Sequence, residues 1–192
     1  MKKILLILFV LLFVNNIQAQ SAEQKKNSEF GRIVLTLVRN LNAGYSFNNT
    51  TNYRLSSYHA GTNYTQPFKR LPAANWQLGA YARWSDYQMK NGKPDFSTTS
   101  VSVPFRIGYR VYADDNLSLR INFGPTYEYV LQDTFSSSEG NRIQRSQLSL
   151  SAGAVLSIAN ITRLYVSYEY YPIGLLSNGD FKRSSFNFSI GL

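Results

Sequence analysis

Alternation of apolar and polar side chains is the feature that most limits what this chain of 192 residues can fold into. Between Ser100 and Tyr112 every second residue is apolar, and the residues between them are small or polar. After a turn at 113–116 the alternation resumes and continues to Leu131. A period of two is the spacing of side chains along one face of a β-strand, so the two segments predict long strands joined in a tight hairpin.

The same period recurs along the chain and predicts eight strands in total. It is clear at 147–158, 163–171 and 186–192, and looser at 33–47, 56–68 and 75–89. Short connections are predicted at 69–74, 113–116 and 159–161, and mostly longer ones, rich in Asn, Ser, Gly and Asp, at 48–55, 90–96, 132–142 and 175–182.

The first nineteen residues predict a cleaved secretory signal. Lys2 and Lys3 form a basic start, residues 4–14 are an unbroken apolar run, and Ile17-Gln18-Ala19 is a suitable cleavage site. The apolar run is shorter than the roughly 20 residues that a transmembrane helix needs, which disfavours a membrane anchor. We therefore expect a signal peptide at 1–19, a short periplasmic segment at 20–30 and one β-barrel domain at 31–192.

Alternation alone does not decide which face of the sheet is inside. A soluble barrel hides its apolar face around a ligand, whereas a membrane barrel turns it toward lipid. The polar face here holds Ser, Asn, Gly and Thr with single Arg or Glu residues and almost no Lys, unlike a water-exposed surface, of which about 25 to 35% is charged. We predict an all-β fold, an eight-stranded antiparallel up-and-down transmembrane β-barrel with a polar, filled interior. The alternative is a periplasmic lipocalin-like barrel that binds an apolar ligand.

Aromatic residues gather near the predicted strand ends, where membrane barrels carry interfacial girdles. Trp76 and Trp84 lie eight residues apart. At about 3.3 Å per residue and a tilt of roughly 40°, this separates them by about 20 Å across the bilayer. The predicted interfacial aromatics are Trp76, Trp84, Tyr127, Tyr129, Tyr168 and Tyr170.

The lumen of an eight-stranded barrel is just wide enough for side chains to fill, so no solute pore is expected. A charge network is predicted there from the inward-facing residues Arg106, Arg110, Arg120, Glu128, Arg163, Glu169 and Arg183. Buried guanidinium and carboxylate groups must pair or be solvated, and we expect bidentate pairs across neighbouring strands, such as Arg120 with Glu128 or Arg163 with Glu169. Because the arginines outnumber the carboxylates, a second interpretation is that surplus positive charge holds an anion or a lipid phosphate.

Residues 97–192 resemble the outer membrane protein β-barrel domain family of Bacteroidota, the PorT-like small barrels. The likeness is carried by Val101-Ser102-Val103-Pro104, by Phe123-Gly124-Pro125-Thr126-Tyr127 and by the closing strand, while residues 31–90 fit only loosely. It implies a Gram-negative outer-membrane location reached through a Sec signal peptide, insertion by the barrel-assembly machinery, and an accessory role in secretion or adhesion. The C-terminal insertion signal would be Phe186, Phe188, Ile190 and Leu192, with Leu where many of these barrels end in an aromatic residue.

The sequence offers little catalytic chemistry, and we expect a protein that is not an enzyme. His59 is the only histidine, and it lacks the close His-x-Ser pairing of lipid-A deacylase barrels. The chain has no cysteine, hence no thiol nucleophile and no thiolate metal site, and no metal and no cofactor are expected.

The net charge of +9 matches anionic partners at the membrane. An exported chain does not meet nucleic acid, so the expected contacts are outer-membrane lipid and lipopolysaccharide. We expect an integral outer-membrane barrel with a structural or interaction role. A protein partner is expected at the extracellular loops 48–55, 132–142 and 175–182 or on the periplasmic side.

Overall fold

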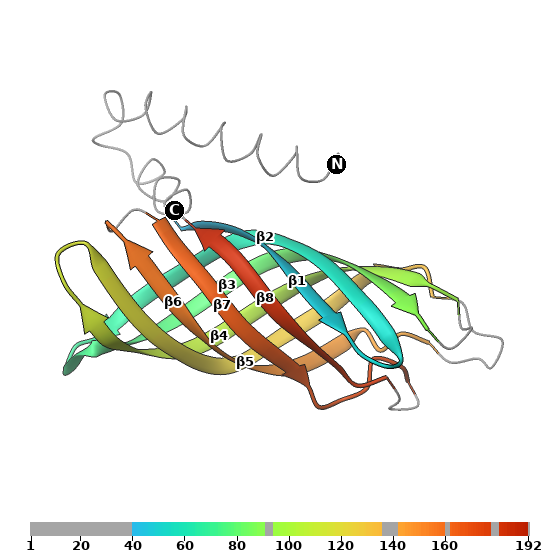
Figure 1. The fold of residues 1–192 in the computed structure, drawn as a ribbon. Coiled ribbons are helices and arrows are strands. Elements are labelled where there is room, and N and C mark those ends of the chain that lie inside the picture. Colours follow the sequence, from blue (N-terminus) through green and yellow to red (C-terminus); the bar gives the residue numbers. More distant parts are fainter. Residues whose placement is uncertain (1–39, 91–93, 136–141, 160–161, 178–180, 192) are drawn as a thin grey trace, which may run out of the picture.

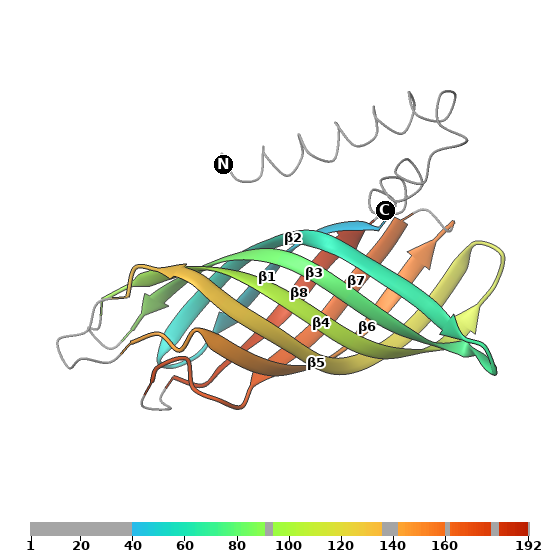
Figure 2. The same cartoon turned by 180° about the vertical axis from the view of Figure 1, so that it is seen from behind.

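The computed structural model describes residues 40–90, 94–135, 142–159, 162–177 and 181–191, which form a closed antiparallel β-barrel. Its strands follow one another around the wall in chain order (Figures 1 and 2). They are β1 (Leu41–Asn49), β2 (Tyr53–Phe68), β3 (Leu71–Met89), β4 (Phe96–Ala113), β5 (Leu117–Asp133), β6 (Ser146–Ile158), β7 (Thr162–Tyr171) and β8 (Arg183–Gly191). The barrel closes where β8 pairs with β1, from Asn42 opposite Gly191 to Phe47 opposite Phe186. The predicted eight-stranded up-and-down barrel is confirmed.

The segments predicted as a signal peptide (1–19) and as a periplasmic segment (20–30) lie outside the described residues, and so does the apolar run 33–38. Those assignments stay predictions. Among the residues that the structure does describe, no helix is long and apolar enough to cross a membrane.

The connections differ in length at the two ends of the barrel. The turns 69–70, 114–116 and 159–161 lie at the end where β1 begins and β8 finishes, which we call the turn end. The connections 50–52, 90–95, 134–145 and 172–182 lie at the opposite end, the loop end.

Two predicted connections are too long. The segment 48–55 shrinks to residues 50–52, because Asn48 and Asn49 complete β1 and Tyr53 begins β2. Asn48 was expected in a loop because its side chain is polar. In the structure it lies in the barrel wall, and its Nδ2 atom donates a hydrogen bond to the carbonyl oxygen of Ser184 at 2.8 Å. The segment 69–74 shrinks to two residues, because β3 already begins at Leu71.

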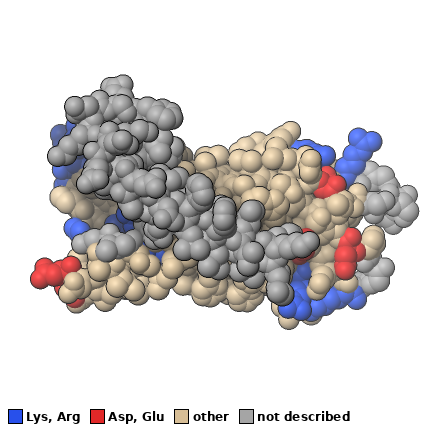
Figure 3. All heavy atoms as spheres, turned by 90° about the horizontal axis from the view of Figure 1, so that it is seen from above, with Lys and Arg blue, Asp and Glu red and all other residues tan. Residues whose placement is uncertain are grey.

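The apolar side chains point outward. Phe123 and Leu150 are 62% and 52% exposed, whereas Glu128 and Ser149 are fully buried in the lumen. On the face that Figure 3 shows, charged side chains gather toward the two ends of the molecule, and the uncovered surface between them is mostly uncharged. The lipocalin-like alternative is therefore wrong, because such a barrel needs its large apolar side chains inside.

The wall is taller on one side than on the other. Strands β2 to β5 have 16 to 19 residues, whereas β1, β7 and β8 have 9 or 10. About 9 to 11 residues are enough for a tilted strand to cross a bilayer. The β2–β3 and β4–β5 hairpins therefore extend beyond the membrane core.

Small residues on the inner face make room for the large ones. Tyr81 of β3 points inward, and a Cβ placed on Gly61 of β2 would lie 2.7 Å from its Cδ1 atom. A Cβ on Gly79 would lie 2.8 Å from Cε2 of the same ring. At Gly61 the added atom would lie closer still to the carbonyl oxygen of Ala80, and at Gly79 to Oδ1 of Asn63. Real Cβ atoms do not approach so closely, so both positions need glycine.

Candidate functional site

An ion-pair network joins opposite walls of the barrel in the half of the lumen nearer the loop end. Arg83 of β3 donates from Nη2 to Oε2 of Glu169 on β7 at 2.9 Å. Arg183 of β8 donates from Nη2 to Oε2 of Glu128 on β5, also at 2.9 Å. A longer contact of 3.4 Å joins Arg83 Nη1 to Glu128 Oε2. All four residues are buried, so two guanidinium groups and two carboxylates give a neutral cluster, which we call the lumen network.

Hydroxyl groups complete the lumen network. Tyr171 accepts a hydrogen bond from Arg83 Nη1 and donates to Glu128 Oε2, each at 2.6 Å. Tyr87 accepts from Arg183 Nη1 at 2.6 Å. Ser100 and Ser149 donate to Glu128 and Glu169 at 2.8 and 2.6 Å. Buried charges are tolerated only when they are paired and hydrogen-bonded, and here six strands, β3 to β8, supply the partners.

Arg183 also lies over an aromatic face. Its Cζ atom is 3.7 Å from the ring centroid of Tyr171, a cation–π geometry that is favourable in a desolvated site. Tyr171 thus contacts both arginines of the network. The Nε atoms of Arg83 and Arg183 are buried and have no hydrogen-bond partner among the described residues.

His59 lies deeper in the lumen, on β2. Its Nδ1 atom is 3.3 Å from the hydroxyl of Ser46 on β1, and its ring meets Tyr81 edge-on with the centroids 5.8 Å apart. Serine beside histidine is the residue pair used by nucleophilic hydrolases. The adjoining cavity, which His59 and Arg106 help to line, measures about 30 Å³, enough for very few water molecules.

Four further inward arginines lie toward the turn end. Arg106 of β4 donates to the hydroxyl of Ser151 at 3.3 Å, and Arg163 of β7 donates to Oδ1 of Asn40 at 3.1 Å. Arg110 of β4 and Arg120 of β5 are directly opposite each other in the strand register. These two and Arg163 line a cavity of about 440 Å³ at the turn end.

The pairs expected from the sequence, Arg120 with Glu128 and Arg163 with Glu169, are wrong. Each pair lies on one strand, eight and six residues apart, which is about 26 and 20 Å at 3.3 Å per residue. The partners instead come from Arg83 and Arg183.

The sequence prediction omitted Arg83 from the network although it alternates with the outward Trp84 and so shares the inward face of β3. It also omitted Tyr87 and Tyr171. A tyrosine on an otherwise polar inward face is a usable signal, because a buried phenol hydroxyl needs a partner.

A cluster of apolar side chains fills the mouth of the barrel at the loop end, and the sequence analysis did not foresee it. We call it the loop cap. Its buried members are Tyr53, Leu55, Tyr87, Phe96, Val130, Ile143 and Leu175. Phe181 packs against it, with its ring centroid 4.6 Å from that of Tyr53. Since Ile143, Leu175 and Phe181 come from the long connections, the described parts of those connections close over the lumen.

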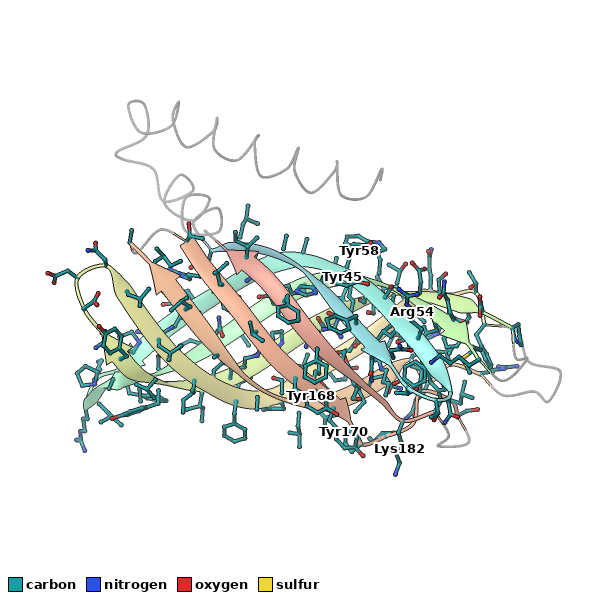
Figure 4. All side chains as sticks on the ribbon, in the orientation of Figure 1. Tyr45, Arg54, Tyr58, Tyr168, Tyr170 and Lys182 are labelled. Carbon is teal, nitrogen blue, oxygen red and sulfur yellow. The ribbon has the colours of Figure 1, made fainter. Side chains whose placement is uncertain are left out.

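The predicted interfacial aromatics lie on the outer wall. Trp84, Tyr127, Tyr129, Tyr168 and Tyr170 are exposed, and Trp76 is half-buried beside Tyr64, with ring centroids 5.4 Å apart. Tyr168 and Tyr170 lie with Tyr45 and Tyr58 in the half of the barrel nearer the loop end (Figure 4). Arg54 and Lys182 lie closer still to that end.

The predicted insertion signal falls on β8. Phe186, Phe188 and Ile190 are exposed on the lipid-facing side of this strand, and Leu192 lies outside the described residues. Recognition of the segment during insertion stays a prediction.

The sequence profile of the family described as "Outer membrane protein beta-barrel domain" matches residues 7–192. The chain belongs to this family. It is therefore an integral protein of the outer membrane and contacts the lipid there. Barrels of this class carry short turns on the periplasmic side and longer loops outside, so we assign the turn end to the periplasm.

Several solved structures are similar to this chain at low identity, and one of them shows the same fold. The outer membrane enzyme PagL is 15% identical, with a TM-score of 0.52 over 79% of this chain and 99% of PagL. Two structures of Ail, the attachment invasion locus protein of Yersinia pestis, are 18% and 17% identical with TM-scores of 0.39 and 0.40, each over 79% of this chain and 95% of Ail. No curated protein matches the chain in sequence.

The comparison with PagL overturns the expectation that the chain is not an enzyme. A barrel of this shape is found in an outer membrane enzyme, so the small polar barrel cannot be used to exclude catalysis. At this identity the likeness shows the fold alone and transfers no activity. Within the part of the chain that the structure describes, no group of three or more His, Cys, Asp or Glu residues could hold a metal ion.

Proposed function

We propose that this protein is a closed outer-membrane barrel that presents an ordered loop platform to a protein partner at the cell surface, in an accessory role in adhesion or secretion. The observation that carries the proposal is the loop cap. In it, Ile143 and Leu175 of the long connections are buried against apolar residues at the strand ends, and this burial holds the described parts of those connections in one arrangement above the membrane.

Backbone pairing between two loops supports the same proposal. Ile143 forms a β-bridge with Leu176, and Gln144 N–H donates to the carbonyl of Leu175 at 2.8 Å. Ser177 N–H donates to the carbonyl of Arg142 at 2.9 Å. Residues 142–144 and 175–177, which we call the loop platform, are thus joined although they belong to different connections. A surface that is ordered before binding loses less conformational entropy when a partner docks.

The closed state is proposed from two layers that cross the lumen toward the loop end. The loop cap covers its outer mouth, and the lumen network spans it in the half nearer that end. The proposal therefore predicts no discrete current steps when the folded protein is added to a planar lipid bilayer. Regular conductance steps from the wild-type protein would contradict it.

Lipopolysaccharide is the proposed lipid contact at the loop end. Tyr45, Tyr58, Tyr168 and Tyr170 form an aromatic belt, and Arg54 and Lys182 lie beyond it toward the outside (Figure 4). Aromatic rings favour the membrane interface, and cations just outside it can meet anionic head groups.

Photo-crosslinking on intact cells tests the partner. A photoreactive residue replaces Arg142 or Ser177 on the loop platform, both of which are exposed, and the control replaces exposed Asp115 at the turn end. We expect a protein adduct of discrete mass from the platform positions and none from Asp115. Equal adducts from both ends would contradict an extracellular partner.

A variant of the loop cap tests whether the ordered loop platform, and not the barrel as such, is needed for binding. Leu175 is fully buried in the cap, so Leu175→Asp places a carboxylate among apolar side chains and should release the loops. Ile173→Asp, at an exposed position, is the matched control. We expect Leu175→Asp to abolish the adduct while heat-modifiable gel migration, which reports the folded barrel, persists. An adduct that survives this change would show that the ordered platform is not what binds.

A further inference from the structure

The lumen contains a second charged region that is unlike the lumen network. At the turn end a cavity of about 440 Å³ is lined by Arg110, Arg120 and Arg163. Ser118, Ser157 and Asn75 also line it, and no Asp or Glu does so among the described residues. We call this cavity the arginine vestibule. Both lumenal carboxylates, Glu128 and Glu169, are already bonded to the other arginines, so they cannot neutralise it.

The guanidinium groups of these three arginines repel one another. Arg110 and Arg120 are direct partners in the β4–β5 register, and like charges directly opposite destabilise a sheet. Arg163, which reaches the same cavity from β7, repels Arg120 as Arg110 does. The Nε atom of Arg120 is buried and has no hydrogen-bond partner among the described residues. The cluster therefore has donors to spare and a repulsion that an anion would relieve.

Neutral donors complete the lining. The hydroxyl groups of Ser118 and Ser157 and the amide of Asn75 can donate to the oxygens that guanidinium groups leave free. Guanidinium groups bind phosphate and carboxylate oxygens in pairs, which gives both strength and orientation. The size of the cavity suits a small molecule and excludes a folded protein.

We propose that the arginine vestibule binds a small, multiply charged oxyanion from the periplasm, one that carries phosphate or carboxylate groups. Binding places negative charge between Arg110, Arg120 and Arg163 and removes their mutual repulsion. The barrel is thus more stable with the anion than without it. This site lies at the opposite end of the lumen from the loop platform, so the two proposals stand or fall separately.

Calorimetry and thermal unfolding with pyrophosphate test the site. The folded barrel in a non-ionic detergent is titrated with sodium pyrophosphate, and sodium chloride of equal ionic strength serves as the reference. We expect saturable heat and a higher unfolding temperature with pyrophosphate only. No saturable binding at millimolar pyrophosphate would overturn the proposal.

Variants locate the binding. Arg120→Gln and Arg163→Gln should weaken pyrophosphate binding about tenfold or more, because hydrogen bonds to charged groups are the stronger class. Arg70→Gln, at an exposed position in the β2–β3 turn outside the lining of the cavity, is the matched control and should bind like the wild type. Without pyrophosphate, Arg120→Gln should be at least as stable as the wild type, because it removes a repulsion. Weaker binding in Arg70→Gln with normal binding in Arg120→Gln would overturn the assignment.

Nanodiscs distinguish a soluble anion from a lipid head group. Discs of phosphatidylcholine alone and discs containing phosphatidylglycerol should show the same rise of unfolding temperature with pyrophosphate, and Arg120→Gln should lose it in both. If phosphatidylglycerol by itself stabilises the barrel and pyrophosphate adds nothing, the vestibule is not a site for a soluble anion.

Discussion

The two halves of the lumen hold the same residue type in opposite states. Toward the loop end, Arg83 and Arg183 are bonded to Glu128 and Glu169, and the charges cancel. At the turn end, the arginine vestibule has no carboxylate in its described lining. The difference arises because both acids lie in the parts of β5 and β7 nearer the loop end. Inward-facing arginines can therefore hold strands together near one end of the barrel and remain available for a ligand near the other end.

The largest loss in the free energy of unfolding is expected when one carboxylate is removed from the neutral lumen network. Glu128→Gln leaves buried Arg183 without its ion-pair partner, and breaking a buried pair from one side costs about 3 to 5 kcal/mol. The measurement is urea unfolding of the barrel in lipid vesicles, followed by tryptophan fluorescence. Asp115→Asn, at an exposed turn position, is the control and should change the free energy of unfolding by less than about 0.5 kcal/mol. A loss below about 1 kcal/mol for Glu128→Gln would show that the network is not what stabilises this half.

An arginine on the lipid face tests the comparison from outside the lumen, where no partner and no water are in reach. Leu150→Arg should cost about 2 to 4 kcal/mol near the membrane midplane. Leu117→Arg, at the turn end of β5, should cost only about 0 to 1 kcal/mol because it lies near the interface. Unfolding in vesicles measures both. Equal costs at the two positions would contradict the placement of the barrel in the bilayer.

Adding a carboxylate to the arginine vestibule should raise the free energy of unfolding. Arg120→Glu replaces a like-charge pair with an opposite-charge pair against Arg110, and we expect a gain of about 1 kcal/mol in the free energy of unfolding. Arg183→Glu, the same change in the neutral half, should instead destabilise the barrel by several kcal/mol, of the order of 3 to 5. The two halves would be equivalent if both variants lost stability to the same extent.

The smallest effect is expected outside the lumen, at the β4–β5 turn. The Tyr112 hydroxyl, and then the backbone N–H groups of Asn116 and Leu117, hold the pKa of Asp114 below its ordinary value of 3.8. A lowered pKa stabilises the turn at pH values above 3.8, and this contribution is lost as the pH falls through the lowered value. We expect the amides of Asn116 and Leu117 to lose protection from hydrogen exchange over that acid range.

The control for the turn is Asp114→Asn. Its amide protection, corrected for the intrinsic pH dependence of exchange, should not change over the same range. An identical acid dependence in the variant would exclude Asp114 as the group responsible.

The strands and their faces were predictable because they depend on local spacing. The outward parity of Leu150 and Phe123 and the inward parity of Glu128 followed from alternation together with the low charge of the polar face, and they hold in the barrel. The strand boundaries were less predictable. Asn48 resembles a loop residue in sequence, yet its side chain bonds to the neighbouring strand β8.

The network was only partly predictable. Arg183, Glu128 and Glu169 were named from the sequence, and the structure brings them together with Arg83, which was not. Arg110, Arg120 and Arg163 lie apart from that cluster and closer to the turn end. Arg106 lies between the two groups and lines the same small cavity as Arg83 and Glu169. The loop cap was missed because it gathers residues from strand ends and loops that share no sequence period.

The sequence by itself determined which side chains share a face of each strand, since a period of two assigns every residue of a strand to one side. The scarcity of charge on the polar face then indicated that this face lines the lumen. Only the tertiary structure decided which lumenal charges meet. Arg83 and Glu169 are 86 residues apart and lie on β3 and β7, strands that do not pair with each other. Their contact exists because closing the sheet brings opposite walls within reach across a narrow lumen. The same closure leaves Arg110, Arg120 and Arg163 together at the other end.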